Sequence, residues 1–97
     1  MIRAIRYSMR GHWLTEAVAG SFWIDHRENS GERAFWYYCP CGCRTRNRII
    51  VGEQFKPDWP PTWEWDGSWS DPTLLPSINQ TQCGWHGWLS LGYWEAI

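Results

Sequence analysis

The sequence predicts a small, mainly β domain: an antiparallel sheet of five to seven short strands with little helix. Its 97 residues are enough for one domain, which we expect to span residues 1–97. Aromatic and β-branched segments of strand length recur along the chain, separated by turns that contain glycine or proline. Residues 55–80 hold five of the six prolines and show no helical period. These three observations favour short strands over helices.

The first third of the chain is predicted to be extended, with one polar turn. Residues 2–10 fit either a strand or a short helical turn, because their apolar and basic positions do not settle the period. Residues 16–25, "EAVAGSFWID", predict a strand in which Gly20 forms a bulge. Residues 26–33, "HRENSGER", are polar, contain Ser-Gly and predict a turn.

The remaining segments predict hairpins. Residues 33–39, "RAFWYYC", and 47–53, "NRIIVGE", are expected to pair antiparallel, with "CPCGC" at the tip of their hairpin. Residues 62–67, "TWEWDG", alternate and end in Asp-Gly, which indicates a strand and a turn. Residues 73–78, "TLLPSI", predict an extended segment that its proline confines to an edge or a loop. Residues 83–97 read as a turn, a strand, a turn at glycine and a strand.

Composition and charge limit the function classes. The chain carries ten tryptophans, and each can bury about 150–250 Å², so most are expected in the core and some on a binding face. Residues 1–48 carry eight basic and four acidic side chains, a net of +4, and residues 49–97 carry one basic and six acidic, a net of −5, which sum to −1. This near-neutral total argues against strong nucleic-acid binding by bulk charge. No apolar run has the length of a membrane span or a signal-peptide core, so we expect a cytoplasmic protein with reduced thiols.

Five side chains could bind a metal ion: Cys39, Cys41, Cys43, Cys83 and His86. Disulfides between the alternating cysteines of "CPCGC" would fit the required geometry poorly. "CPCGC" supplies one tight turn and "CGWH" a second, and structural zinc sites take their four tetrahedral ligands in this way. We therefore predict a zinc-ribbon-like or hairpin-like domain stapled by Zn²⁺, because a chain this short is marginally stable without a staple. The alternative is four thiols without a metal.

These five candidates compete for four coordination positions. Cys83, His86 and Cys41 are the preferred ligands, and Cys39 and Cys43 compete for the last position. A site of four thiolates without His86 stays open as an alternative. Four protein ligands leave no place for a water molecule, so the predicted zinc is structural.

The motif order "CPCGC", "WEWDG", "DPTLLPSI" and "CGWHGWLSLG" resembles a small zinc-binding domain of phages and bacteria, some bacterial members of which lie beside ubiquitin-like conjugation genes. The resemblance covers about residues 35–95. It implies metal binding by the five side chains named above. It implies structural roles for a second set: Trp65, Asp66, Gly67, Pro72, Pro76, Ser77 and Gly92. It also implies a phage-type setting, in which a small protein often binds and blocks a host factor.

Together these features predict a non-enzymatic interaction protein in the host-cell cytoplasm. It would bind a host or phage protein and modulate or inhibit a host protein or defence complex through an aromatic and acidic surface. The candidate surface lies in "WPPTWEWDGSW" and comprises Trp59, Trp63, Trp65 and Trp69. One alternative is a nucleic-acid-binding zinc module, because Arg44, Arg46 and Arg48 would share one face of a strand. The other is a zinc-dependent enzyme, for which no diagnostic base spacing is present; no membrane partner is expected, and no oligomeric state is predicted.

Overall fold

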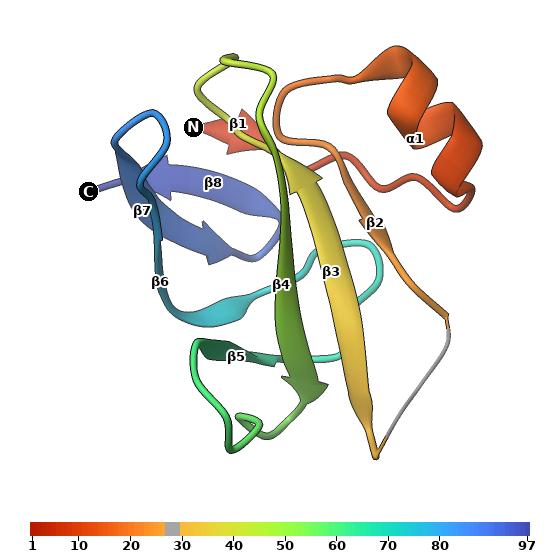
Figure 1. Ribbon diagram of the computed structural model, residues 1–97, viewed down its shortest axis with the longest axis vertical. Helices are drawn as coiled ribbons and strands as arrows, with labels where there is room; N and C mark the ends of the chain where they lie inside the picture. The colour runs from red at the N-terminus through yellow and green to blue at the C-terminus, as the bar shows by residue number, and fades with distance from the viewer. Residues whose placement is uncertain (27–29) are drawn as a thin grey trace.

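A single curled sheet carries most of the chain. The computed structural model describes residues 1–26 and 30–97, and among them eight strands form one sheet in the order β1-β8-β7-β6-β5-β4-β3-β2 (Figure 1). Neighbouring strands are antiparallel except β4 and β5, which are parallel. The mainly β fold class is confirmed, with more strands than expected. The elements are β1 (Ile2–Arg3), α1 (Arg10–Glu16), β2 (Phe22–Ile24), β3 (Glu32–Tyr38), β4 (Arg46–Glu53), β5 (Thr62–Trp65), β6 (Leu74–Gln80), β7 (Trp85–Ser90) and β8 (Tyr93–Ala96).

The segment that follows β1 joins the two edges of the sheet. On one side, the amide of Ala4 donates to the carbonyl of Gly92, 2.8 Å away, next to β8. On the other, the amide of Tyr7 donates to the carbonyl of Phe22 in β2, and the amide of Phe22 donates to the carbonyl of Ile5, both at 2.9 Å. The sheet therefore curls almost onto itself and encloses its own core.

The core is aromatic, as expected for a short chain that must bury large side chains. Trp94 of β8 is 2% exposed; its indole nitrogen donates to the carbonyl of Gly20, 2.9 Å away, and its ring lies 5.1 Å from Tyr37 and 5.7 Å from Trp85. Around it lie the other buried members of the cluster: Ala4, Phe22, Ile24, Phe35, Tyr37, Ile49, Val51, Trp65, Leu74, Ile78 and Leu89.

Helix α1 differs from the sequence expectation, which has no helix at residues 10–16. Its N-cap residue, Met9, makes no side-chain capping bond, so the sequence carries no start signal there. The helix ends at Ala17, which adopts a left-handed φ of 47°. Trp13 is fully buried and packs against Tyr38 of β3, with ring centroids 4.6 Å apart. No helix in the described part of the chain is long and apolar enough to cross a bilayer.

The strand predicted over residues 16–25 is shorter than expected, because α1 ends at Glu16 and residues 17–21 belong to no strand. Strand β2 begins only at Phe22, and Gly20, predicted as a bulge, lies in a turn with φ +79°. Its amide donates to the carbonyl of Tyr38, 3.0 Å away. The turn predicted over residues 26–33 falls partly on residues 27–29, which lie outside the described residues.

The later strands follow the prediction with two exceptions. The β3–β4 hairpin, the strand at β5 and the β7–β8 hairpin are confirmed. Strand β5 lies parallel to the second half of β4, since residues 54–61 carry the chain back until Thr62 lies opposite Ile50. Strand β6 is internal, between β5 and β7, so the prediction of an edge or loop for Pro76 is wrong. Pro76 is tolerated because it lies within a register shift between Leu74 and Ile78, where no regular ladder bond is required.

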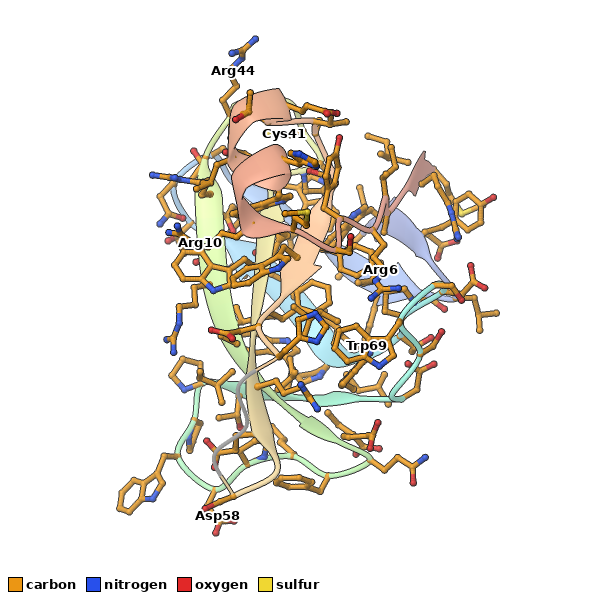
Figure 2. The ribbon with its side chains drawn as sticks, turned by 90° about the vertical axis from the view of Figure 1, so that its right-hand side faces the viewer. Arg6, Arg10, Cys41, Arg44, Asp58 and Trp69 are labelled. Atoms are coloured by element: carbon orange, nitrogen blue, oxygen red, sulfur yellow. The ribbon has the colours of Figure 1, made fainter. Side chains whose placement is uncertain are left out.

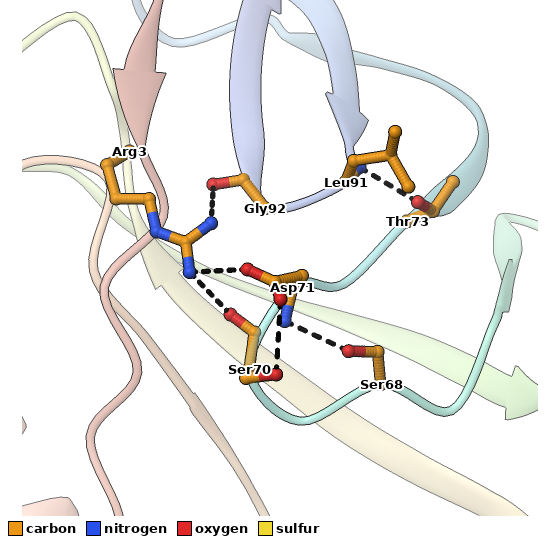
Figure 3. Close-up of polar contacts among 7 residues, drawn as sticks. All are labelled: Arg3, Ser68, Ser70, Asp71, Thr73, Leu91 and Gly92. Carbon is orange, nitrogen blue, oxygen red and sulfur yellow. Dashed lines mark hydrogen bonds and ion pairs between the residues drawn. The ribbon is translucent and has the colours of Figure 1, made fainter.

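A polar clamp ties β1 to the loop before β6 and to the β7–β8 turn (Figure 3). The guanidinium of Arg3 donates to the carbonyls of Gly92 and Ser70, 3.2 and 3.0 Å away, and forms an ion pair with Asp71. A Cβ atom at Gly92 would collide with the Arg3 guanidinium, and its φ of +81° is left-handed. The left-handed φ therefore favours glycine here, and any other side chain would also displace the Arg3 guanidinium from the clamp.

Candidate functional site: a thiol cluster and a serine–histidine pair

Four cysteine thiols converge at one end of the sheet. The sulfur of Cys39 lies 3.2 Å from that of Cys41 and 3.3 Å from that of Cys83, and the Cys41 and Cys83 sulfurs are 3.5 Å apart. Cys43 completes the group, whose four ligand atoms all lie within 4.8 Å of one another. All four cysteines are free, and these separations are far longer than a disulfide bond of about 2.05 Å.

The geometry of this thiol cluster (Cys39, Cys41, Cys43 and Cys83) fits a tetrahedral metal ion. With Zn–S bonds of about 2.3 Å, the sulfurs of a tetrahedral site lie about 3.8 Å apart, close to the separations observed. Burial raises the pKa of the Cys39 thiol, whereas hydrogen bonding to the Thr45 hydroxyl lowers the pKa of Cys43 to about 6. The cluster can therefore hold a metal ion, consistent with zinc, and thiolates are the donors that zinc prefers.

Two turns build the cluster. After β3, the amide of Cys39 donates to the carbonyl of Thr45 at 2.9 Å and the amide of Gly42 to the carbonyl of Cys39 at 3.2 Å. Gly42 has a φ of +87°, which folds "CPCGC" back on itself. After β6, the carbonyl of Gln80 accepts from the amides of Cys83 and Gly84, at 3.3 and 2.8 Å. The two turns lie far apart in sequence and meet because β3 and β6 end, and β4 and β7 begin, at this side of the sheet (Figure 1).

A hydrogen-bond network of Gln80, Tyr37 and Asn47 lies next to the turns that carry the cluster. The Gln80 side-chain oxygen accepts from the hydroxyl of Tyr37 at 2.7 Å and from the side-chain amide of Asn47 at 2.9 Å. Asn47 also donates to the Tyr37 oxygen, 3.0 Å away. Burial is the main reason why the pKa of Tyr37 is raised to about 12, so this phenol stays a neutral donor. The network links the β3–β4 hairpin to the turn that carries Cys83.

The structure does not bring His86 into the thiol cluster. Cys83 lies in the turn, whereas His86 is the second residue of β7 and is exposed on the outward face of the sheet. Its Nε2 lies 3.1 Å from the Oγ of Ser77 on the adjacent strand β6. Of the four-ligand sets considered from the sequence, the geometry favours the four thiols, and it gives His86 a serine as its partner.

Two features fix the position of Ser77. It lies in the register shift of β6, between Leu74 and Ile78, and such irregularities redirect side chains next to active sites. The indole nitrogen of Trp63 donates to the carbonyl of Ser77, 3.3 Å away. The sequence analysis gave Ser77 a structural role. The missed signal is that Ser77 and His86 lie at outward positions on the two strands of one hairpin.

Only some of the four tryptophans assigned to the predicted aromatic surface are exposed. Trp59 is 88% exposed, but Trp65 has no exposed area and lies in the core, so its assignment to a binding face is wrong. Trp63 and Trp69 are half-buried and pack against the core. The alternation of "TWEW" explains this, because Trp65 points inward from β5, toward the enclosed side of the curled sheet.

The three predicted arginines are exposed near the cysteine end, and Arg44 protrudes there beside Cys41 (Figure 2). Arg46 and Arg48 lie on β4, and the guanidinium of Arg48 lies 5.9 Å from the centroid of Trp36. Arg10 of α1 lies at the same distance from that ring. In the described part of the chain, Arg44, Arg46 and Arg48 form no ion pair with an acidic side chain.

The fold and the site define a small β domain with a thiol cluster that can hold a metal ion and a serine–histidine pair beside it. The chain belongs to the family described as "Bacterial ubiquitination-like system serine protease (BubE)", whose model matches residues 9–97. No curated protein and no solved structure matched the chain. The family agrees in part with the resemblance found in the sequence, that of a small bacterial domain near ubiquitin-like conjugation genes. Its description names a serine protease, whereas the sequence analysis predicts no enzyme.

Proposed function

We propose that this chain is a serine peptidase of a bacterial ubiquitination-like system, with Ser77 as nucleophile and His86 as general base. The observation that carries the proposal is the contact of 3.1 Å between the Ser77 hydroxyl and the His86 imidazole, on the exposed face of β6 and β7. A serine hydroxyl is a weak nucleophile until a neighbouring base takes its proton, and this distance lies within hydrogen-bond reach. The family description supports the same reaction class.

The chemistry follows from this geometry. As the Ser77 oxygen bonds to the substrate carbonyl carbon, its proton passes to the Nε2 of His86. The protonated imidazole then gives that proton to the leaving amine, the C–N bond breaks, and an acyl-serine remains. Water, deprotonated by His86, hydrolyses this ester and restores the serine. No carboxylate of the described residues hydrogen-bonds to the other nitrogen of His86, so the pair acts as a dyad.

The thiol cluster has a separate role in this proposal. Four thiolates fill a tetrahedral ion's coordination, so zinc bound there supplies structure and not a reactive water. Cys83 lies in the turn between the strands that carry Ser77 and His86. Zinc would therefore hold the hairpin of the dyad against the β3–β4 hairpin.

A fluorophosphonate probe tests the dyad without knowledge of the substrate, because it forms a covalent bond only with an activated serine. We expect the full-length, zinc-loaded protein to be labelled at Ser77, as mapped by peptide mass spectrometry. Ser77→Ala should abolish labelling, and His86→Ala should slow it by about 10³-fold or more, since the base is then missing.

Ser8→Ala and His12→Ala are matched controls. Both residues are exposed, and His12 makes no hydrogen bond to a serine in the ranges 1–26 and 30–97. Both variants should label at the wild-type rate. An unlabelled wild-type protein that is folded and loaded with zinc would overturn the proposal, as would labelling that survives Ser77→Ala.

A second candidate function is binding to a nucleic acid or to a host or phage protein. It is favoured by Arg44, Arg46 and Arg48, which are exposed and form no ion pair among the described residues, and by Trp59 beside Asp58. We expect fluorescence anisotropy with a single-stranded oligonucleotide to show affinity that falls steeply with salt. Replacing Arg44, Arg46 and Arg48 by glutamine should flatten the slope of log K against log[salt] by about 2, at roughly 0.7 per phosphate contact. An unchanged slope would exclude these arginines as phosphate contacts. The second candidate function would then be reduced to binding of a host or phage protein, with inhibition of a host complex.

A further inference from the structure

A hollow of about 290 Å³ opens on the outer face of β6, β7 and β8. Its walls include Leu75 of β6, Trp88 and Ser90 of β7 and Glu95 of β8. Whole-ligand sites usually measure about 300–1,000 Å³, so this hollow has the size for a single side chain. It is mostly apolar, and Glu95 is the one charged residue among the described residues that line it.

The hollow lies beside the serine–histidine pair. Side chains two residues apart on a strand share a face, so Trp88 lies on the same face of β7 as His86. Leu75 precedes Ser77 by two positions on β6, but the register shift between Leu74 and Ile78 interrupts the regular alternation there, so the placement of the hollow depends on Trp88 and His86. Two residues of strand span about 7 Å. An extended peptide bound with its carbonyl at Ser77 would therefore place a side chain within two residues of that carbonyl over the hollow.

The lining matches a long cationic side chain. Trp88 is 39% and Leu75 is 50% exposed, so both present apolar surface to solvent. Trp88 and Glu95 are direct cross-strand partners, which puts the carboxylate next to the indole. No cation of the described residues pairs with Glu95. Lysine and arginine bury an aliphatic stem against apolar surface and place their charge on a carboxylate or over an indole ring, and this hollow offers all three contacts.

We propose that this hollow is a specificity subsite for a lysine or arginine side chain of the substrate, within two residues of the bond that is cut. The inference rests on the proposed function, because it assumes cleavage at Ser77. It adds the substrate class: extended segments of protein with a basic residue near the cleaved bond. Leu75 and Trp88 would hold the stem of that residue, and Glu95 would hold its charge.

Cleavage of a diverse peptide mixture by the full-length protein, read by mass spectrometry, tests the preference. We expect the cut sites to be enriched in lysine and arginine at one position within two residues of the bond. For a preferred peptide, replacing its basic residue by norleucine, which keeps the stem and removes the charge, should lower kcat/KM at least 10-fold. Glu95→Gln should cause a similar loss on the basic peptide and none on the norleucine peptide. The control Asp58→Asn, in the loop between β4 and β5 (Figure 2), should leave both rates unchanged, because Asp58 does not line the hollow.

A binding measurement separates failure of this inference from failure of the proposed peptidase. Nα-acetyl-lysine amide, titrated into ¹⁵N-labelled protein, should shift the Trp88 indole resonance in wild type and in Ser77→Ala, and much less in Glu95→Gln. Acetyl-norleucine amide should give at least 5-fold smaller shifts. Saturable lysine binding without any cleavage would keep the subsite and overturn the peptidase. Cleavage without basic preference, or the absence of a Trp88 shift with lysine amide, would overturn the subsite.

Discussion

Replacement of Cys83 by serine is expected to release the bound metal and unfold the domain. Cys83 is the one ligand candidate outside "CPCGC" in the thiol cluster, so its thiolate alone connects the β6–β7 turn to the β3–β4 hairpin through the ion. Structural zinc contributes about 10–16 kcal/mol in small zinc domains, and a whole domain is stable by only about 5–15 kcal/mol. Elemental analysis should fall from one equivalent of zinc to nearly none, and circular dichroism should lose the thermal transition.

His86→Ala and Cys43→Ser are the paired controls for this prediction, since they separate the two ligand sets. A four-thiolate site predicts that His86→Ala keeps a full equivalent of zinc and the wild-type melting temperature, while Cys43→Ser loses affinity. The reverse pattern, with zinc lost in His86→Ala and kept in Cys43→Ser, would return His86 to the metal site and remove it from the dyad. A Cys83→Ser protein that stays folded with full zinc content would contradict the assignment of Cys83 as a zinc ligand and of zinc as the link between the two turns.

Trp94→Ala is expected to cost about 3–5 kcal/mol of the free energy of unfolding. The ring is 2% exposed and packs between Tyr37 and Trp85, and its indole nitrogen donates to the carbonyl of Gly20. The substitution leaves a large cavity and a backbone acceptor without its donor. For a domain of this size each kcal/mol lowers the melting temperature by roughly 4–8 °C. Urea unfolding at saturating zinc would measure the loss.

Trp59→Ala makes the same chemical change at a site that is 88% exposed, so it should alter stability by less than about 0.5 kcal/mol. The loss of stability in Trp94→Phe should lie between those of Trp94→Ala and Trp59→Ala, because phenylalanine keeps an aromatic ring and loses the hydrogen bond to Gly20. If Trp94→Ala and Trp59→Ala were equally stable, the enclosed core described here would be wrong.

The sequence predicted best the features that depend on near neighbours. The β3–β4 hairpin follows from two β-rich segments on either side of "CPCGC", and its register places Tyr38 opposite Arg46 next to the cysteine tip. The convergence of Cys83 on that tip was also predictable, because four thiols in a reduced protein indicate a shared metal. The β7–β8 hairpin was marked by the glycine at position 92.

Features that depend on distant partners could not be read in the same way. Helix α1 has no capping signal, and the burial of Trp13 against Tyr38 stabilises it. The position of Ser77 depends on a register shift in β6, and local residue preferences do not specify such a shift. His86 has the Cys-x-x-His spacing of a zinc ligand. Its side chain nevertheless points from β7 toward Ser77 and not toward the thiol cluster, which the spacing alone does not reveal.

The pairing of β1 with β8 constrains the order in which the strands can pair while the protein is synthesised. Ile2 lies opposite Trp94, so β1 has no partner until β8 has been synthesised. Contacts that close so long a stretch of chain form late in folding. Until then the edges of the sheet stay open, and Ile2, Ile5 and the indole of Trp94 are available to other chains. The nascent protein should therefore depend on protection by chaperones most strongly in the interval between translation of β7 and docking of β1.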